Sequence, residues 1–222
     1  MKLLGLWGLI TGLIFFSCNQ TNATAENKYG QLKVSDESKD KREIRVLIRQ
    51  VLNWSKSTKS IDLLPALEDK KSKVYTGFNL VEHKQNLQKL KATSLFAAEF
   101  IDNYNQIILT LDKRLKKGEY GKWLVGDLPS FNFANNNDPW SGCQDVPYDK
   151  PNPFDFIEVE VVKLESLKGE MNWKWGNLQR NTDPSWRKFK YRFRVVKENN
   201  QWKIAYLKWF DFKTSVKKYD EL

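Results

Sequence analysis

Two cysteines and one histidine are the side chains in this sequence best suited to covalent or metal chemistry. Cys143 lies in a stretch rich in Asn, Asp and Pro, far along the chain from His83, which is the only histidine. A cysteine nucleophile needs a neighbouring base to form its thiolate, so we interpret Cys143 as a buried or inert thiol. One histidine and two cysteines do not make a zinc-type cluster, and we expect no metal site and no cofactor.

Four aspartates in the same stretch could supply oxygen ligands to Ca²⁺. They are Asp138, Asp145, Asp149 and Asp155. Their positions lack the alternating spacing and the central glycine of an EF-hand loop. Asp beside Pro and Asn is typical of turns, and turn formation is the simpler interpretation.

The segment before Cys18 has the pattern of a bacterial export signal. Its apolar run from Leu3 to Phe16 would rise about 21 Å as a helix, which is short of the roughly 30 Å bilayer core and suits a signal peptide. Ser17-Cys18 resembles a lipobox, in which the cysteine becomes the mature N-terminus and carries the lipid. Several acyl chains on one residue would give stable membrane anchoring. The alternative is an ordinary secretory peptide cleaved near Ala23 or Ala25.

These patterns divide the chain into three parts. We predict a lipoprotein signal peptide at residues 1–17, a lipidated N-terminus and flexible polar tether at residues 18–39, and a single domain at residues 40–222. No acidic run resembling a surface-export signal follows Cys18. The predicted location is therefore the bacterial cell envelope, on the outer membrane and facing the periplasm.

The formal net charge of +10 favours anionic partners. The lysines are scattered, however, with acids between them, and no recognition helix, zinc finger or RNA-binding signature accompanies them. We interpret most of the charge as a solvated surface and do not expect nucleic acid as a partner. A hydrophobic share of 41% with 14% aromatic residues is ample for a packed core.

The first half of the domain has helical periodicity. Apolar residues at Ile44, Leu47, Ile48, Val51 and Leu52 follow the spacing of one helix face. The predicted helices span 40–56, a short broken segment within 61–74, 79–91 beginning at the capping box Asn79-x-x-Glu82, and 94–117.

The second half has the alternation of half-buried strands. The predicted strands are 157–167, with a bulge at Val161–Val162; 169–176, with Met171, Trp173 and Trp175 on one face; and a hairpin over 188–212 that turns at 198–201. Residues 207–212 are apolar on both faces.

Residues 120–156 form a long connection, and loops of this length are often functional.

Helices followed by antiparallel strands indicate an α+β fold, with N-terminal helices packed on the sheet. The amphipathic helix, the bulged strand and Gln201–Leu207 (QWKIAYL) resemble the nuclear-transport-factor-2-like (cystatin-like) fold, in which a curved antiparallel sheet wraps helices into a cone with a pocket. The lipobox, residues 100–123 and the loop at 138–145 more narrowly resemble a family of bacterial envelope lipoproteins. That resemblance covers about residues 43–212, and its motifs indicate fold rather than activity.

Two candidate sites are considered, one implied by the resemblance and one inferred from the tryptophans and the long loop. Related folds with hydrolase or isomerase activity place Asp, His or Tyr inside the cone, and here the candidate pocket residues are Tyr104, Tyr191, Trp209 and Asp211. A candidate binding surface comprises Trp140, Asp145 and Trp186, because indoles supply large rigid contact area. Core packing is the alternative for the aromatic members of both sets.

The function expected from these patterns is a lipid-anchored envelope binding or accessory protein. Its contact surface would be the mouth of the cone and the loop at 120–156, and its partners would be the membrane, through the N-terminal lipid, and an envelope protein. Two alternatives stay open. One is a small-molecule hydrolase or isomerase-like enzyme using the cone pocket. The other is an immunity-type inhibitor of a secreted toxin, for which the basic charge would suit an acidic partner.

Overall fold

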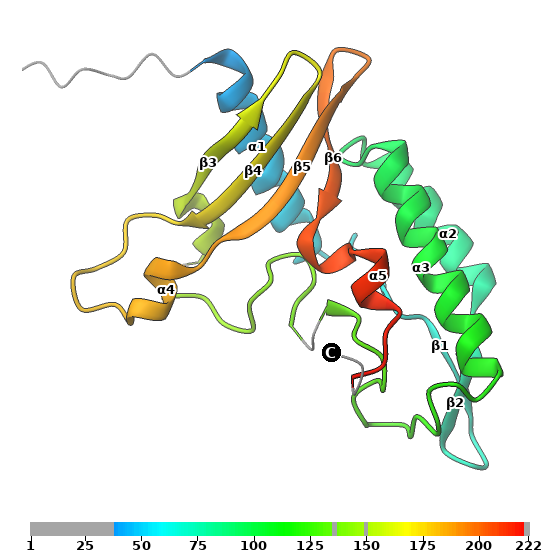
Figure 1. The fold of residues 1–222 in the computed structure, drawn as a ribbon. Coiled ribbons are helices and arrows are strands. Elements are labelled where there is room, and N and C mark those ends of the chain that lie inside the picture. The colour runs from blue at the N-terminus through cyan, green and yellow to red at the C-terminus, as the bar shows by residue number, and fades with distance from the viewer. Residues whose placement is uncertain (1–37, 135–136, 149–150, 220–222) are drawn as a thin grey trace, which may run out of the picture. The chain divides into compact units, whose positions relative to one another are not determined.

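The computed structural model of the chain describes residues 38–134, 137–148 and 151–219. The predicted signal peptide, Cys18 and most of the predicted tether lie outside these residues. All described helices and strands belong to the unit Glu37–Leu222 (Figure 1).

A four-stranded antiparallel sheet forms the C-terminal half of this unit. Its strands lie in chain order, β3 (Ile157–Leu164), β4 (Lys168–Trp175), β5 (Tyr191–Glu198) and β6 (Gln201–Leu207). One face is buried: Met171, Trp173 and Trp175 alternate with half-exposed residues along β4, as predicted. The pairing of β3 with β4 shifts register between Val161 and Lys163, which confirms the predicted bulge.

The β5–β6 hairpin turns at Asn199 and Asn200, whose φ angles are 50° and 62°. A two-residue hairpin requires left-handed backbone at both positions, and Asn tolerates it better than most residues. The turn is therefore where the sequence predicted it.

The predicted bounds of the hairpin, residues 188–212, were wrong at both ends. Residues before Tyr191 form a short helix, α4 (Pro184–Lys188), which begins after the capping residue Asp183. Beyond Leu207 the chain leaves the sheet through a 3₁₀ turn, η3 (Lys208–Phe210), and a short helix, α5 (Phe212–Ser215). The apolar residues on both faces of this segment are explained by the turn, which buries Phe210 completely.

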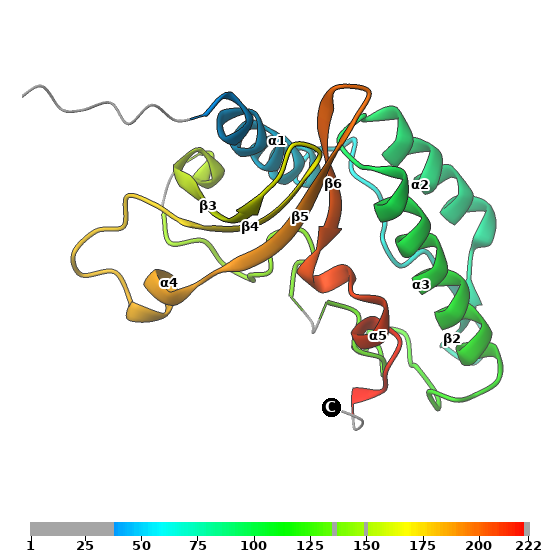
Figure 2. The same ribbon diagram turned by 45° about the horizontal axis from the view of Figure 1, so that its top comes forward.

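Helix α1 (Lys39–Ser55) covers the buried face of the sheet, as Figures 1 and 2 show from two directions. Its five predicted core residues are all buried, which confirms the helix and its face. The Arg49 guanidinium donates to the carbonyl of Ile157 at 3.0 Å. The Asp40 carboxylate accepts from Lys197 Nζ and Trp202 Nε1, each at 2.9 Å. These bonds attach α1 to β3 at one edge of the sheet and to the β5–β6 hairpin at the other edge.

Helices α2 (Leu80–Ala92) and α3 (Ala98–Lys116) pack together beside β6. Asn79 Oδ1 accepts from the Glu82 amide at 3.1 Å, so the predicted capping residue begins α2. Helix α3 begins after the predicted Ser94 because Ser94 has φ of 59° and the next residues extend. Phe96 pairs in parallel with Ile204 of β6 and closes the edge of the sheet there.

A β-hairpin replaces the broken helix predicted within 61–74, and that prediction was wrong. The strands are β1 (Ala66–Asp69) and β2 (Val74–Phe78). Asp69 makes the turn, because its carboxylate accepts from the amide of Lys71 and the hydroxyl of Ser72. Such a local side-chain bond competes with helix formation.

Aromatic side chains fill the space between α1, α3 and the end of the sheet. Phe210 lies at the centre, with its ring centroid 4.9 Å from Phe100, 5.0 Å from Trp140, 5.6 Å from Phe133 and 6.0 Å from Tyr104. The α+β class with helices on an antiparallel sheet is therefore confirmed.

Candidate functional site

The C-terminal segment anchors the first half of the long connection that follows α3. Tyr120 donates its hydroxyl proton to the carbonyl of Val216 at 2.7 Å. Phe131 forms an antiparallel bridge with Lys218 and is fully buried. This part of the loop is thus a packed layer of the domain.

A turn organised by Asp138 anchors the second half. The Asp138 carboxylate accepts from the Trp140 amide at 3.0 Å, the Ser141 hydroxyl at 2.9 Å and Lys56 Nζ at 2.6 Å. Lys56 is the residue that caps the C-terminus of α1. The turn is therefore fixed both to itself and to the helix that covers the sheet.

Gly142 lets this turn lie directly on the sheet. Its φ is 71°, and a Cβ added there would lie 2.3 Å from Tyr191 Cδ2 and 2.8 Å from Trp209 Nε1. The Tyr191 hydroxyl donates to the Pro139 carbonyl at 2.6 Å. Tyr191 and Trp209 were both predicted to line a pocket. They instead pack against the loop at Gly142.

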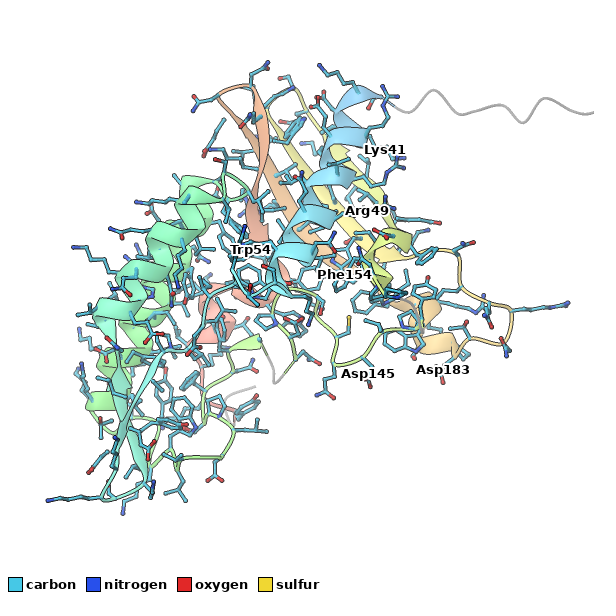
Figure 3. The ribbon with its side chains drawn as sticks, turned by 180° about the vertical axis from the view of Figure 1, so that it is seen from behind. Lys41, Arg49, Trp54, Asp145, Phe154 and Asp183 are labelled. Carbon is cyan, nitrogen blue, oxygen red and sulfur yellow. The ribbon has the colours of Figure 1, made fainter. Side chains whose placement is uncertain are left out.

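An exposed arch follows the turn. We use "the arch" for residues 144–147, in which Gln144, Asp145 and Val146 are exposed (Figure 3). The arch leaves the packed Cys143 and ends at Tyr148, whose hydroxyl donates to the Gly176 carbonyl. The Tyr148 ring also contacts Trp175 and Phe156. Both ends of the arch are therefore attached to the buried side of the structure.

The three residues of the predicted binding surface lie in different environments. Trp140 is buried, with 4% of its surface exposed, and packs against Trp54 and Phe210. Asp145 is exposed on the arch. Trp186, in α4, is half-buried with its ring 6.1 Å from Trp175. Only Asp145 and Trp186 present side chains at the surface, and the two indoles belong to separate aromatic clusters.

The four predicted pocket residues lie at or beside η3: Trp209 belongs to it, Asp211 follows it, and Tyr191 and Tyr104 contact it. Tyr104 is fully buried and donates its hydroxyl proton to the Leu63 carbonyl at 2.9 Å. Burial raises the pKa of both Tyr104 and Tyr191 above the ordinary value. Both phenols are therefore neutral, and each donates its hydroxyl proton to a backbone carbonyl. These bonds give both residues a structural role.

Asp211 lies at a surface cavity of about 430 Å³ beside α3. Its Oδ1 accepts from the amide and the hydroxyl of Thr214, so it caps α5. Arg194 enters the same cavity, where it pairs with Glu99 at 2.9 Å and lies over the Tyr206 ring at 5.0 Å. The cavity thus carries charge of both signs at its wall.

The cysteine and the histidine are not assembled into a catalytic pair. Cys143 donates weakly to the Ser141 carbonyl at 3.3 Å, and burial raises the pKa of its thiol to about 11. His83 lies between α2 and α3, bound to Asn105 at 2.9 Å. Across residues 38–134, 137–148 and 151–219, no group of three or more His, Cys, Asp or Glu side chains is placed to hold a metal ion.

The sequence reasoning missed one contact that organises this region. The pairing of Lys56 with Asp138 joins distant parts of the chain, and neither residue carries a local signal for it.

No protein-family model, curated protein or solved structure matches the chain. Within the part of the chain that the structure describes, every helix is too short or too polar to cross a membrane.

Proposed function

We propose that the chain is a lipid-anchored protein of the bacterial envelope that binds an envelope protein through the arch. The lipid anchor at Cys18 is proposed from the apolar run and the Ser17-Cys18 motif. The resemblance to bacterial envelope lipoproteins supports the same location, on the outer membrane facing the periplasm. The binding role rests on the geometry of the loop.

The observation that carries the binding role is an exposed segment with fixed ends. Asp145 is exposed and Val146 retains 40% of its surface, while Tyr148 and Cys143 on either side are packed. A surface segment held in one conformation loses less entropy on binding than a loose loop does. The arch also offers an acidic and an aliphatic side chain next to each other, which suits a partner with a basic rim around an apolar depression.

We also propose that the domain has the cone-like, nuclear-transport-factor-2-like arrangement. Support comes from α1, which contacts both edge strands β3 and β6, from α3, which contacts β6, and from the aromatic cluster around Phe210. In this arrangement the loop at 120–156 would lie at the mouth of the cone, and the arch is one of its exposed segments.

The test compares two double variants in the same loop. Asp145→Lys/Val146→Ser changes the arch, and Asp127→Lys/Leu128→Ser changes a second exposed acid–aliphatic pair outside it, in which Leu128 is more exposed than Val146. We expect the arch variant to lose co-purified envelope partner from cross-linked cells by about tenfold or more, and the control to retain it. Equal recovery with both variants contradicts the arch as the interface. The intact mass of the mature protein, with Cys18→Ser as reference, tests the lipid separately.

The cavity at Asp211 favours a second candidate, a small-molecule enzyme or binding protein. Its wall combines Arg194, Lys213, Glu99 and Asp211, so a small zwitterion is the ligand class that it fits. Saturable binding of a zwitterion that Arg194→Ala abolishes would favour this candidate. An immunity-type role would instead be identified by an acidic toxin as the partner recovered from cells.

A further inference from the structure

We propose that a groove between α1 and the segment joining α2 to α3 binds the C-terminal residues of a polypeptide. The groove recognises a free α-carboxylate together with an apolar last side chain. It does not include the arch, and its use requires neither the lipid anchor nor the arch. It is therefore a second binding site, with a ligand of defined chemistry.

The groove consists of two adjoining surface cavities that share Gln50, Thr93 and Leu95. The first cavity, which we call the basic end, has a volume of about 510 Å³, and the second, which we call the amide end, has about 370 Å³. The basic end is also lined by Trp54, Lys59, Lys89 and Ala92. The amide end is also lined by Glu43, Leu47, Ser94, Asn200, Gln201 and Trp202.

Both walls of the groove are held by contacts with the rest of the domain. The Ile204 amide of β6 donates to the Leu95 carbonyl at 2.9 Å and so fixes one wall to the sheet. On the other wall, the Trp54 ring packs edge-on against Phe96 and Trp140, with centroid distances of 5.5 Å and 5.3 Å. Figure 3 shows Trp54 near the end of α1. Because these walls are formed before a ligand arrives, binding costs less ordering entropy.

The basic end places two cations beside an apolar wall. Lys59 and Lys89 line it together with Trp54, Ala92 and Leu95. Both lysines are exposed, and neither forms an ion pair with any residue among 38–134, 137–148 and 151–219. An ammonium group that is not already paired attracts a carboxylate. This end therefore fits a ligand that carries a carboxylate next to an apolar or aromatic group.

The amide end carries groups that match a peptide backbone. The side chains of Gln50, Asn200 and Gln201 are exposed, and each can both donate and accept hydrogen bonds. Within the described part of the chain, none of these three amides has a hydrogen-bond partner. A peptide presents N–H and C=O groups in alternation, whereas an acyl chain presents neither. A peptide therefore fits the amide end better than a fatty acid does.

The length of the groove fits a short extended segment. The groove follows α1 from Trp54 back to Glu43, a rise of about 16 Å along the helix axis. An extended chain advances about 3.3 Å per residue, so about five residues fit. The last residue places its side chain against Trp54 and its carboxylate near Lys59 and Lys89. The preceding residues lie along the amide side chains.

The experiment measures the binding of labelled pentapeptide pools to the full chain by fluorescence anisotropy. Both pools carry an uncharged dye at the N-terminus, four randomised residues without Asp or Glu, and a final phenylalanine. One pool ends in a free carboxylate and the other in an amide. We expect saturable binding of the acid pool, and binding of the amide pool that is weaker by about tenfold or more, because the amide lacks the charge that the lysines attract.

Two double variants with equal changes in net charge locate the carboxylate. Lys59→Gln/Lys89→Gln removes both cations of the basic end, and the acid pool should then bind as weakly as the amide pool. Lys84→Gln/Lys91→Gln removes two exposed cations from the nearly opposite side of α2 and should keep the preference for the acid. Ala92→Glu places a larger, negative side chain in the basic end and should weaken the acid pool by more than tenfold.

Equal binding of the two pools, or no binding at about 1 mM peptide, would overturn the groove as a C-terminal peptide site. Equal effects of the two double variants would also overturn it. Displacement of the acid pool by an equal concentration of decanoate would replace the peptide by a fatty acid as the occupant. The arch variant Asp145→Lys/Val146→Ser should bind the acid pool as the parent does, which separates the groove from the arch. If a variant fails to fold by circular dichroism, the difference between the two pools on the parent protein decides.

Discussion

Gly142→Ala tests whether the arch depends on close contact between its turn and the sheet. The added Cβ would lie 2.3 Å from Tyr191 Cδ2, whereas carbon atoms in contact are normally about 3.5–4.0 Å apart. One of the two groups must therefore move by about 1.2 Å or more. Tyr191 cannot retreat easily, because it is 1% exposed and its hydroxyl is bound to Pro139.

The magnitude follows from two contributions. An alanine with positive φ costs about 1–2 kcal/mol, and overpacking in a closed site costs about 1–3 kcal/mol more. Gly121 provides the control, because its φ is 72° and nothing lies within 4 Å of its added Cβ. We expect a loss of about 2–5 kcal/mol in the free energy of unfolding for Gly142→Ala, and about 1–2 kcal/mol for Gly121→Ala.

Urea unfolding followed by tryptophan fluorescence measures both values. The double variant Gly142→Ala/Tyr191→Leu should lose about 1–2 kcal/mol less than the sum of its single variants, since the smaller side chain removes the overlap. The reasoning is refuted if the two glycine variants lose equal stability, or if the double variant is strictly additive.

Three further predictions concern the interior. Phe210→Ala should lower the free energy of unfolding by about 3–5 kcal/mol, because the ring is fully buried among aromatic neighbours; urea titration measures this, and the half-buried Trp209→Ala should lose less. Burial lowers the pKa of His83, so the folded state binds fewer protons than the unfolded state. The contribution of neutral His83 to the free energy of unfolding should be fully present above the unfolded pKa of about 6.5. Below that pH the free energy of unfolding should fall by at most about 1.4 kcal/mol per pH unit. His83→Gln should abolish this pH dependence in urea titrations across pH 5–8. Finally, Cys143 should react with maleimide at pH 7.5 far more slowly in the folded protein than in urea, because its thiol pKa is raised to about 11; equal rates would contradict its packed position.

The elements predicted correctly are those whose signal lies within a few residues. Helix α1, the α2 cap at Asn79, the bulge after Val161 and the Asn199–Asn200 turn all follow from periodicity or from turn chemistry. The β1–β2 hairpin was missed because its strands are short and its turn depends on the side chain of Asp69. Local propensity is overridden where such side-chain bonds compete with it.

The candidate site was only partly predictable, because burial in a loop is decided by partners elsewhere in the chain. Trp140 follows Asp138-Pro139, a sequence typical of an exposed turn, yet it is buried against Trp54 of α1. The contact depends on Lys56 and Tyr191, which hold the turn from two different elements. Asp211 did carry a local signal, since an Asp three residues before Thr214 is a capping pattern.

The turn that precedes the arch is tied to the helix that covers the sheet. Lys56 caps the C-terminus of α1 and pairs with Asp138 at the base of the arch's turn. The 17 residues of α1 rise about 25 Å, so the start of the helix lies about that far along its axis from Lys56. Figure 3 shows Lys41 near the start of α1 and Asp145 beyond the other end of the helix. The arch's turn is therefore attached at the end of α1 that is farther along the chain from Cys18, which suits the binding role proposed for a lipid-anchored protein.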